Sequence, residues 1–278
     1  MLRPDIIPAY VPAQMRGDSS ASWLVGIHSG QPVIILGGAP GLDAHPELPL
    51  IAGRPVIGTN WTLELLTPTY LQIVDASVWN HQASKITASQ TIILATQGIF
   101  GGGSYYSAKS PNVARFVGGE VPLKVFFKIK MSQGGYRDPN TGFFHRPMAE
   151  PYLCSDPTQP FYFGGNSLCY ALQWAHIMGA SMALLMGFTL KSGSGYFFLP
   201  NGQKPTKSSG IYEMDRARGF LSVLEAQKPG WAKVVDGWEG PVYDLLPRTS
   251  LAMALGVAQR ADRADHTGEV RSKPKLPW

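Results

Sequence analysis

The fold of this chain is decided by the stretch Val33-Ile34-Ile35-Leu36-Gly37-Gly38-Ala39-Pro40-Gly41-Leu42. Its first four residues form a continuous apolar run, which is typical of a strand buried on both faces of a sheet. The small residues that follow predict either a tight turn or a backbone that approaches a phosphate closely. Pro40 breaks the G-x-G-x-x-G pattern and the chain contains no Gly-Lys-Ser/Thr, so we expect neither a standard dinucleotide site nor a P-loop.

Three further apolar runs of the same kind follow, and each ends at a polar or glycine residue. They are Val56-Ile57, Tyr70–Val74 and Thr91–Ala95. Short buried strands in this pattern predict an α/β fold with a mostly parallel sheet and helices on both faces. Ligands of such sheets bind at the carboxyl ends of the strands. Gly37, Asn60 and Asp75 each follow a strand, so we expect them to lie at one edge.

The second half of the chain predicts a helix that starts at Ser167 and closes at Gly179, because apolar residues recur there at helical spacing. Asn166 or Ser167 is suited to cap its N-terminus. The other elements expected downstream are a central strand Met182–Met186, a helix Ile211–Glu225 and short strands at Lys233–Val235 and Val242-Tyr243.

The pattern predicts one domain with three irregular parts. Residues 1–31 are expected to form an N-terminal arm, and residues 32–256 a single domain. An insertion or lid over residues 97–160 interrupts this domain, where paired glycines separate aromatic and basic residues. Residues 257–278 are polar and basic, so we expect a flexible tail.

Composition excludes several classes of protein. Hydrophobic residues make up 44% and charged residues 15%, which excludes a charged disordered chain and a coiled coil. The only cysteines, Cys154 and Cys169, form no C-x-x-C pair, which argues against a disulfide scaffold and suits a reducing compartment. Glycine and polar residues interrupt the uncharged stretch 157–190, and no secretory pattern opens the chain. We therefore expect a cytoplasmic protein that does not enter a membrane.

The net charge of +5 favours anionic partners such as nucleotides, phosphosugars or nucleic acid, without choosing among them. The histidines form no H-x-x-x-H pair, so we expect no metal site. The oligomeric state stays open, a homo-oligomer included.

The order of these motifs resembles the bacterial sialyltransferase-like glycosyltransferases. It is equally similar to a related Rossmann-like domain of unknown function, which includes archaeal 6-hydroxymethylpterin diphosphokinases and uncharacterised phage proteins. Those families open with a strand and Gly-x-Gly-Pro-Ser-Leu, then a strand ending in Asn and one ending in Asp or Asn. The matching residues here are Gly37–Leu42, Ile57–Asn60 and Ile73–Asp75.

The second signature of those families is Ser-Gly, a helix ending in Leu-Gly-Ala, and a strand ending in Leu-x-Gly-x-Asp. The residues in those places are Asn166–Leu168, Met178–Ala180 and Leu185–Thr189. The resemblance covers about residues 32–80 and 164–250. It implies a Rossmann-like fold in which Gly37, Gly38, Ala39, Pro40 and Gly41 wrap a nucleotide phosphate.

The resemblance also implies that Asn60 and Asp75 contact phosphate or ribose, and that Asn166 and Ser167 contact the base or its ribose. A structural reading of each stays open beside this one. Asn60 could cap a turn, Asp75 could cap a helix, and Ser167 could be only an N-cap.

The chain departs from the family where catalysis would occur. Gly41 and Thr189 replace a serine and an acidic residue, and no histidine between His176 and His266 matches the sialyltransferases' catalytic one. We expect His176 to be packed rather than catalytic.

The base would then come from the loop Lys191–Gly210 and the residues that follow it, Tyr212, Glu213 and Asp215. Glu213 could deprotonate an acceptor hydroxyl if burial raised its pKa, and Tyr212 or Tyr196 could stabilise a leaving phosphate. The alternative is that Glu213 and Asp215 only favour the helix dipole.

These observations leave three hypotheses. The first is a nucleotide-dependent glycosyltransferase with a nucleotide sugar as donor substrate, no tightly bound cofactor, and a carbohydrate or nucleic-acid base as acceptor, as in phage-type DNA modification. The second is a pyrophosphoryl transferase that needs Mg²⁺ on ATP, with Asp75 as the best metal-ligand candidate. The third is a non-catalytic protein that keeps the fold.

Overall fold

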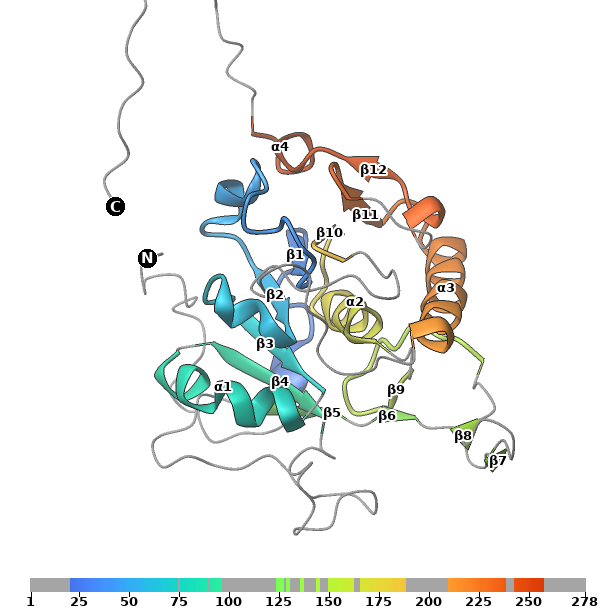
Figure 1. Ribbon diagram of the computed structural model, residues 1–278. Coiled ribbons are helices and arrows are strands. Elements are labelled where there is room, and N and C mark those ends of the chain that lie inside the picture. The colour runs from blue at the N-terminus through green and yellow to red at the C-terminus, as the bar shows by residue number, and fades with distance from the viewer. Residues whose placement is uncertain are drawn as a thin grey trace, which may run out of the picture.

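A computed structural model describes eleven segments of the chain (Figure 1). They are residues 21–74, 76–89, 91–96, 124–127, 129–130, 136–137, 144–145, 150–162, 166–188, 210–238 and 243–257.

An eight-stranded sheet forms the centre of the fold, with strand order β12-β11-β10-β1-β2-β3-β4-β5. The strands are β1 (Pro32–Leu36), β2 (Val56–Thr59), β3 (Tyr70–Ile73), β4 (Ile92–Thr96), β5 (Lys124–Phe127), β10 (Met182–Met186), β11 (Ala232–Val235) and β12 (Arg248–Thr249). Every pair of neighbours is parallel, which confirms the α/β fold predicted from the short buried runs.

Two corrections to the expected strands follow. Lys124–Phe127 lies inside the expected insertion 97–160, yet it is β5 and pairs with β4 at the edge of the main sheet. Tyr243 does not belong to a strand, because it begins a short 3-10 helix, η8 (Tyr243–Leu245), and the last strand comes later as β12. Val242 lies outside the described residues.

Helices cover both faces of the sheet. They are α1 (Ala76–Ala88), α2 (Ser167–Ile177), α3 (Gly210–Gln227) and the single turn α4 (Leu251–Ala254). Leu71 and Ile73 of β3 belong to the buried cluster that includes α1 residues, whereas Tyr70 belongs to the larger core that includes α2. Because side chains alternate along a strand, α1 and α2 pack on opposite faces. Figure 1 shows α1 on one side of β3 and β4, and α2 and α3 on the other.

The remaining described elements are short. They are the 3-10 helices η3 (Ser22–Leu24), η4 (Leu48–Ile51) and η5 (Asn60–Glu64), the parallel pair β6 (Ile129–Lys130) and β9 (Phe161–Tyr162), and the antiparallel pair β7 (Tyr136–Arg137) and β8 (Phe144–His145). Part of the expected N-terminal arm packs into the domain, since Leu24 and His28 are buried.

The described part of the uncharged stretch 157–190 contains β9, α2 and β10; the helix and the later strand were predicted, whereas β9 was not. Asn166 caps α2, because its Oδ1 accepts a hydrogen bond of 3.1 Å from the Cys169 N–H. After α2, Gly179 has a φ of +77°, a conformation that glycine adopts without strain. In the described part of the chain, no helix has both the length and the hydropathy needed to cross a bilayer.

The strand order reverses beside β1. The chain runs from β1 through β2, β3 and β4 to β5 in one direction, and then places β10, β11 and β12 on the other side of β1. In open parallel sheets, ligands bind beyond the carboxyl ends of the strands near such a reversal. A ligand site is therefore expected among the residues that follow β1, β2, β3 and β10.

Candidate functional site

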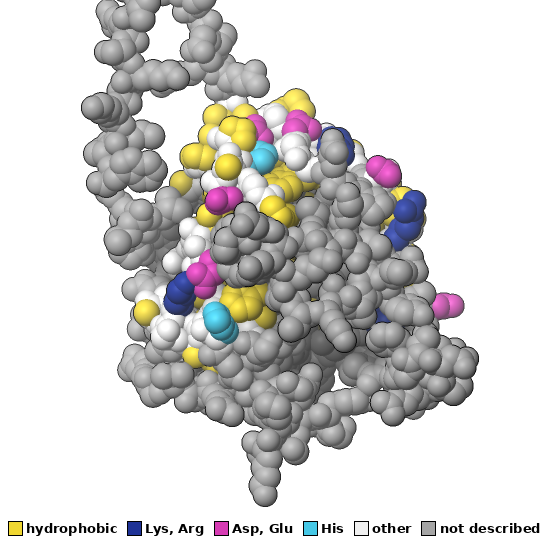
Figure 2. All heavy atoms as spheres, viewed as in Figure 1, with side chains coloured by type: hydrophobic (Ala, Val, Ile, Leu, Met, Phe, Trp, Pro, Cys, Tyr) yellow, Lys and Arg dark blue, Asp and Glu magenta, His cyan; other side chains and the backbone are white. Residues whose placement is uncertain are grey.

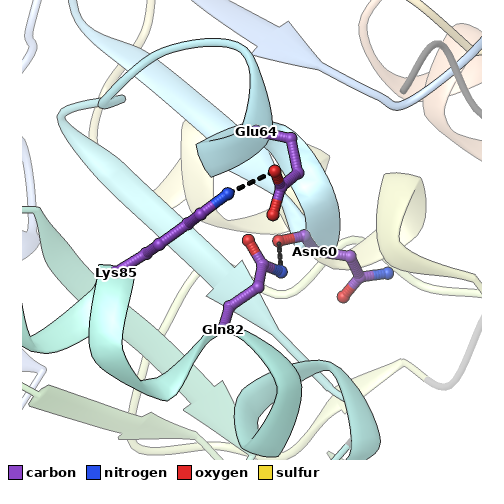
Figure 3. Close-up of polar contacts among 4 residues, drawn as sticks. All are labelled: Asn60, Glu64, Gln82 and Lys85. Atoms are coloured by element: carbon purple, nitrogen blue, oxygen red, sulfur yellow. Dashed lines mark hydrogen bonds and ion pairs between the residues drawn. The ribbon is translucent and has the colours of Figure 1, made fainter. Parts of the chain in front are cut away.

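Asn60 follows β2 directly and has an unusual backbone conformation. Its φ of +50° is the only positive φ recorded for a non-glycine among the described residues. Asparagine tolerates this left-handed region better than most side chains, but it is favoured there only when the surroundings hold it. One such contact is visible in Figure 3, where the Gln82 Nε2 of α1 donates a hydrogen bond of 2.9 Å to the Asn60 carbonyl.

The side chain of Asn60 reaches the start of α2. Its Nδ2 donates a hydrogen bond of 2.9 Å to the Ser167 Oγ, across 107 positions of sequence. A second amide meets the same serine, since the Gln72 Nε2 of β3 donates 3.0 Å to the Ser167 carbonyl oxygen. The structure thus brings together Asn60 and Ser167, two of the residues selected from the sequence, and adds Gln72 to them.

The amide oxygens in this contact chain are buried and unused. Asn60 Oδ1, Gln72 Oε1 and Gln82 Oε1 have no hydrogen-bond partner among the described residues. Gln72 is 0% exposed and Gln82 is 1% exposed, so neither side chain is solvated at the surface. Buried polar atoms without partners are rare in native proteins, and they mark places where a missing partner would bind.

The glycines after β1 serve the packing of the sheet. The Gly37 N–H donates 2.8 Å to the Met186 carbonyl, and the Ala39 N–H donates 2.8 Å to the Gly187 carbonyl. A Cβ on Gly37 would lie 2.1 Å from the Gly187 oxygen, so the close approach of the β1 and β10 ends requires glycine there. Both of these N–H groups are engaged by the protein itself.

The outer part of the same turn is open. Gly41 has a φ of +84°, and a Cβ built there would meet nothing within 4 Å. Pro40 and Gly41 are exposed and Gly38 is half-buried. If this turn contacts an anion, Gly38 and Gly41 are the residues free to approach it, rather than Gly37 and Ala39.

Threonine hydroxyls connect the turn after β1 with Asn60. The Thr59 Oγ1 donates 3.0 Å to the Leu36 carbonyl, and the Thr62 Oγ1 lies 3.4 Å from the same oxygen. Thr59 and Thr62 flank Asn60 in the chain, so the ends of β1 and β2 lie side by side. The structure therefore places Gly37 and Asn60 at neighbouring strand ends, whereas Asp75, the residue expected after β3, lies outside the described residues.

The expected catalytic groups are not placed by the structure. Asp75, Thr189 and Tyr196 lie outside the described residues. Tyr212 and Glu213 lie near the start of α3, the helix predicted over 211–225, but their side chains are not among those described. The catalytic roles suggested for Asp75, Tyr212 and Glu213 stay predictions.

His176 is packed, as expected, rather than placed in an open site. It is half-buried, and its ring meets Trp231 edge-on with a centroid distance of 6.0 Å. Burial, and after it the nearby Lys228, lower its pKa to about 4. The imidazole is therefore neutral at pH 7.

Among the described residues of this edge, neither a cluster of charged side chains nor a metal-binding group is present. No group of three or more His, Cys, Asp or Glu among the described residues could hold a metal ion. On the face drawn in Figure 2, the described Lys and Arg side chains lie apart from one another. Near Asn60, Figure 3 shows the ion pair of Lys85 with Glu64, which uses both charges. The described side chains that bond to Ser167 are the amides of Asn60 and Gln72.

Sequence reasoning missed Gln72 and Gln82. The signal for Gln72 was present, because one amide interrupts the otherwise apolar run Tyr70–Val74, which was interpreted as a buried strand. A buried polar side chain requires a partner, and that requirement could have drawn attention to it. Gln82 gave no such signal, since a glutamine on a helix resembles an ordinary solvated residue.

Comparisons with known proteins add no assignment to this geometry: no family model, no curated protein and no solved structure matches the chain. The described residues define an α/β protein whose candidate site brings the amides of Asn60 and Gln72 to Ser167.

Proposed function

We propose that this protein is a nucleotide-dependent transferase, and specifically a glycosyltransferase that uses a nucleotide-activated sugar. The observation that carries the proposal is the contact of Asn60 with Ser167 at the carboxyl edge of a parallel sheet. These two residues come from separate halves of the chain, and the resemblance to the sialyltransferase-like families implies a nucleotide contact for each of them. The acceptor would be a carbohydrate or a nucleic-acid base.

The chemistry of the edge supports a nucleotide better than a free anion. Amides and hydroxyls form directional hydrogen bonds with bases and sugars, which are neutral and rich in polar atoms. The α2 N-terminus, which starts at Ser167, adds a partial positive charge that favours a phosphate nearby. In such a site, the rate enhancement comes from holding donor and acceptor in position and from stabilising the departing phosphate.

The test is a thermal-shift screen of the whole chain against CMP, UDP, GDP and ATP, each with Mg²⁺ and with EDTA. A ligand at 100 times its dissociation constant raises the free energy of unfolding by about 2.7 kcal/mol, which shifts the melting temperature by several degrees. The proposal expects at least one of CMP, UDP or GDP to produce this shift in EDTA. A shift only with ATP and Mg²⁺ would favour the pyrophosphoryl transferase, and no shift with any nucleotide would refute the proposal.

Two serine variants show whether the binding occurs at this edge. Ser167→Ala removes the hydroxyl that accepts from Asn60, while Asn166 still caps α2, so the nucleotide shift should shrink. Ser89→Ala is the matched control, because the Ser89 Oγ donates only to the Ile86 carbonyl at the end of α1. Equal nucleotide shifts in both variants would place the nucleotide elsewhere.

A further inference from the structure

Two amides donate hydrogen bonds to Ser167, and each amide has one buried oxygen without a partner among the described residues. Asn60 donates to the serine hydroxyl and Gln72 donates to the serine carbonyl, which places both amide groups beside one residue. Asn60 Oδ1 and Gln72 Oε1 have no partner among the described residues. We call Asn60, Gln72 and Ser167 the amide pair site.

Gln82 does not belong to this site, although its oxygen is also unpaired. Figure 3 shows that its amide lies on the backbone side of Asn60, while the Asn60 side chain points away from it. The two oxygens that can act together are therefore those of Asn60 and Gln72.

The burial of these oxygens indicates a specific ligand rather than general hydration. Gln72 is 0% exposed, so bulk water does not solvate its amide, and an unpaired buried acceptor destabilises the folded protein. Asn60 is held in the left-handed region, where strain is tolerated mostly at functional positions. Asn60 and Ser167 are only half-buried, so the site lies close to the surface.

The unpaired donors and acceptors of the Asn60 and Gln72 amides match a particular chemical group. Each amide presents an unpaired oxygen and, beside it, a second N–H hydrogen on the nitrogen that already donates once to Ser167. A hydroxyl group both donates and accepts, so one hydroxyl can pair with each amide. A phosphate oxygen only accepts, and it would be repelled by the two amide oxygens. Two neighbouring hydroxyls on one ring meet this requirement.

We propose that the amide pair site binds the vicinal diol of a sugar ring. Such a diol has two sources here, the ribose of a nucleotide and a hexose, and the experiment separates them. The assignment to ribose rests on the proposed nucleotide-dependent function. With ribose bound, the protein discriminates ribonucleotides from 2′-deoxyribonucleotides, because a missing hydroxyl leaves one buried amide oxygen unpaired again.

The experiment is calorimetric titration of the whole chain with CMP, UMP, GMP and AMP, and with the 2′-deoxy form of each. For any base that binds, the 2′-deoxy form should bind about tenfold more weakly to the wild type. Asn60→Gly removes one amide and keeps the backbone conformation, since glycine adopts a positive φ freely. Gln72→Met removes the other amide at similar volume. The ribo-to-deoxy ratio should fall toward one in both variants.

Thr91→Val is the matched control, because Thr91 is a buried polar residue at the amino end of β4, at the opposite edge of the sheet. Its ribo-to-deoxy ratio should equal that of the wild type. If Gln72→Met fails to fold, Asn60→Gly decides the result alone.

The remaining outcomes separate this proposal from the proposed function. Ribonucleotides and deoxyribonucleotides that bind equally well would overturn the diol site and leave a nucleotide-binding protein. If no nucleotide binds, D-glucose and D-ribose at 100 mM are tested in thermal shift. A sugar shift in the wild type that is lost in Asn60→Gly would support the diol site without nucleotide dependence. No response to nucleotides or sugars would overturn both.

Discussion

Two buried glutamines, one in the interior and one at the carboxyl edge of the sheet, differ in how many of their hydrogen-bonding groups are paired. Gln173 of α2 is 0% exposed and its amide is used on both sides: its Oε1 accepts from the Tyr162 N–H at 2.8 Å, and its Nε2 donates to the carbonyls of Tyr162 and Cys169. Gln72 is equally buried, but only its nitrogen is paired. An amide whose oxygen and nitrogen are both paired within the protein stabilises the fold. An amide with an unpaired oxygen can accept a hydrogen bond from a ligand.

The same contrast occurs within one strand. Tyr70 and Gln72 both lie in β3 and, two residues apart, point to the same face of the sheet. At the amino end, the Tyr70 hydroxyl pairs with the His28 Nε2 at 2.8 Å. At the carboxyl end, the Gln72 oxygen has no partner in the described part of the chain. Within β3, the polar side chain at the amino end is therefore paired, whereas the one at the carboxyl end keeps an unpaired oxygen among the described residues.

The largest expected effect comes from a change at the end of β1, where Gly37 lies against the Gly187 backbone. Gly37→Ala places a methyl group 2.1 Å from the Gly187 carbonyl oxygen, far inside van der Waals contact, so β1 and β10 must separate. We expect a loss of about 3 kcal/mol or more in the free energy of unfolding, measured by urea denaturation.

The control for this change is Gly41→Ala, in the outer part of the same turn. There the methyl group has space, and only the positive φ opposes it, so the loss should be about 1 kcal/mol. Equal losses in the two variants would mean that the turn is uniformly loose and that the close contact of Gly37 has no energetic consequence.

The second prediction concerns the two glutamines directly. Gln173→Leu leaves the Tyr162 N–H and carbonyl buried without their amide partner, so we expect a loss of about 2 kcal/mol in the free energy of unfolding. Gln72→Leu removes one hydrogen bond but also removes the unpaired oxygen, so its loss should be about 1 kcal/mol or less. Urea denaturation measures both, and a larger loss for Gln72→Leu would reverse the contrast.

Much of this fold was predictable because its signals are local. The runs that became β1 to β4 are buried on both faces and continuous, and the Asn166 cap needs only a few neighbouring residues. The meeting of polar residues at one edge was also predictable, since it follows from parallel strands alone. Asn60 and Ser167 are the part of that edge that the structure places in contact.

The rest depends on contacts that local patterns do not encode. Two apolar residues at Val242-Tyr243 do not distinguish a strand from a 3-10 turn, and four residues at Lys124–Phe127 become a strand only by pairing with β4. The unused oxygen of Gln72 depends on what surrounds β3 in space, and so does the left-handed backbone of Asn60. Periodicity treats both as ordinary polar positions.

The third prediction concerns His28, which pairs with Tyr70 at the amino end of β3, and the pH dependence of the free energy of unfolding. Burial lowers the pKa of His28 to about 4, so the folded protein keeps this imidazole neutral while the unfolded chain protonates near pH 6.5. The unfolded state then binds more protons as the pH falls, and the free energy of unfolding decreases between pH 6.5 and 4. We expect about 1 kcal/mol of this decrease between pH 6.5 and 5 to come from His28.

The measurement is urea denaturation at several pH values, for the wild type and for His28→Gln. His176 has a lowered pKa as well and contributes a decrease of the same sign, so the variant should reduce the pH dependence rather than abolish it. An unchanged pH dependence in His28→Gln would show that burial does not keep the His28 imidazole neutral in the folded protein.

The smallest expected effect concerns the backbone of the incomplete edge. Asn60→Ala and Asn60→Gly both lose the bond to Ser167, but only alanine opposes the φ of +50°. The strain of about 1–2 kcal/mol exceeds the entropic disadvantage of glycine, about 0.5–1 kcal/mol, so Asn60→Gly should be the more stable variant by roughly 0.5–1 kcal/mol. This order is the reverse of the one found in regular helices and strands. Urea denaturation of the two variants measures this difference. If the alanine variant is as stable as the glycine variant, residue 60 can leave the left-handed region at no cost. The contacts with Gln82 and Ser167 would then not enforce the backbone conformation of Asn60.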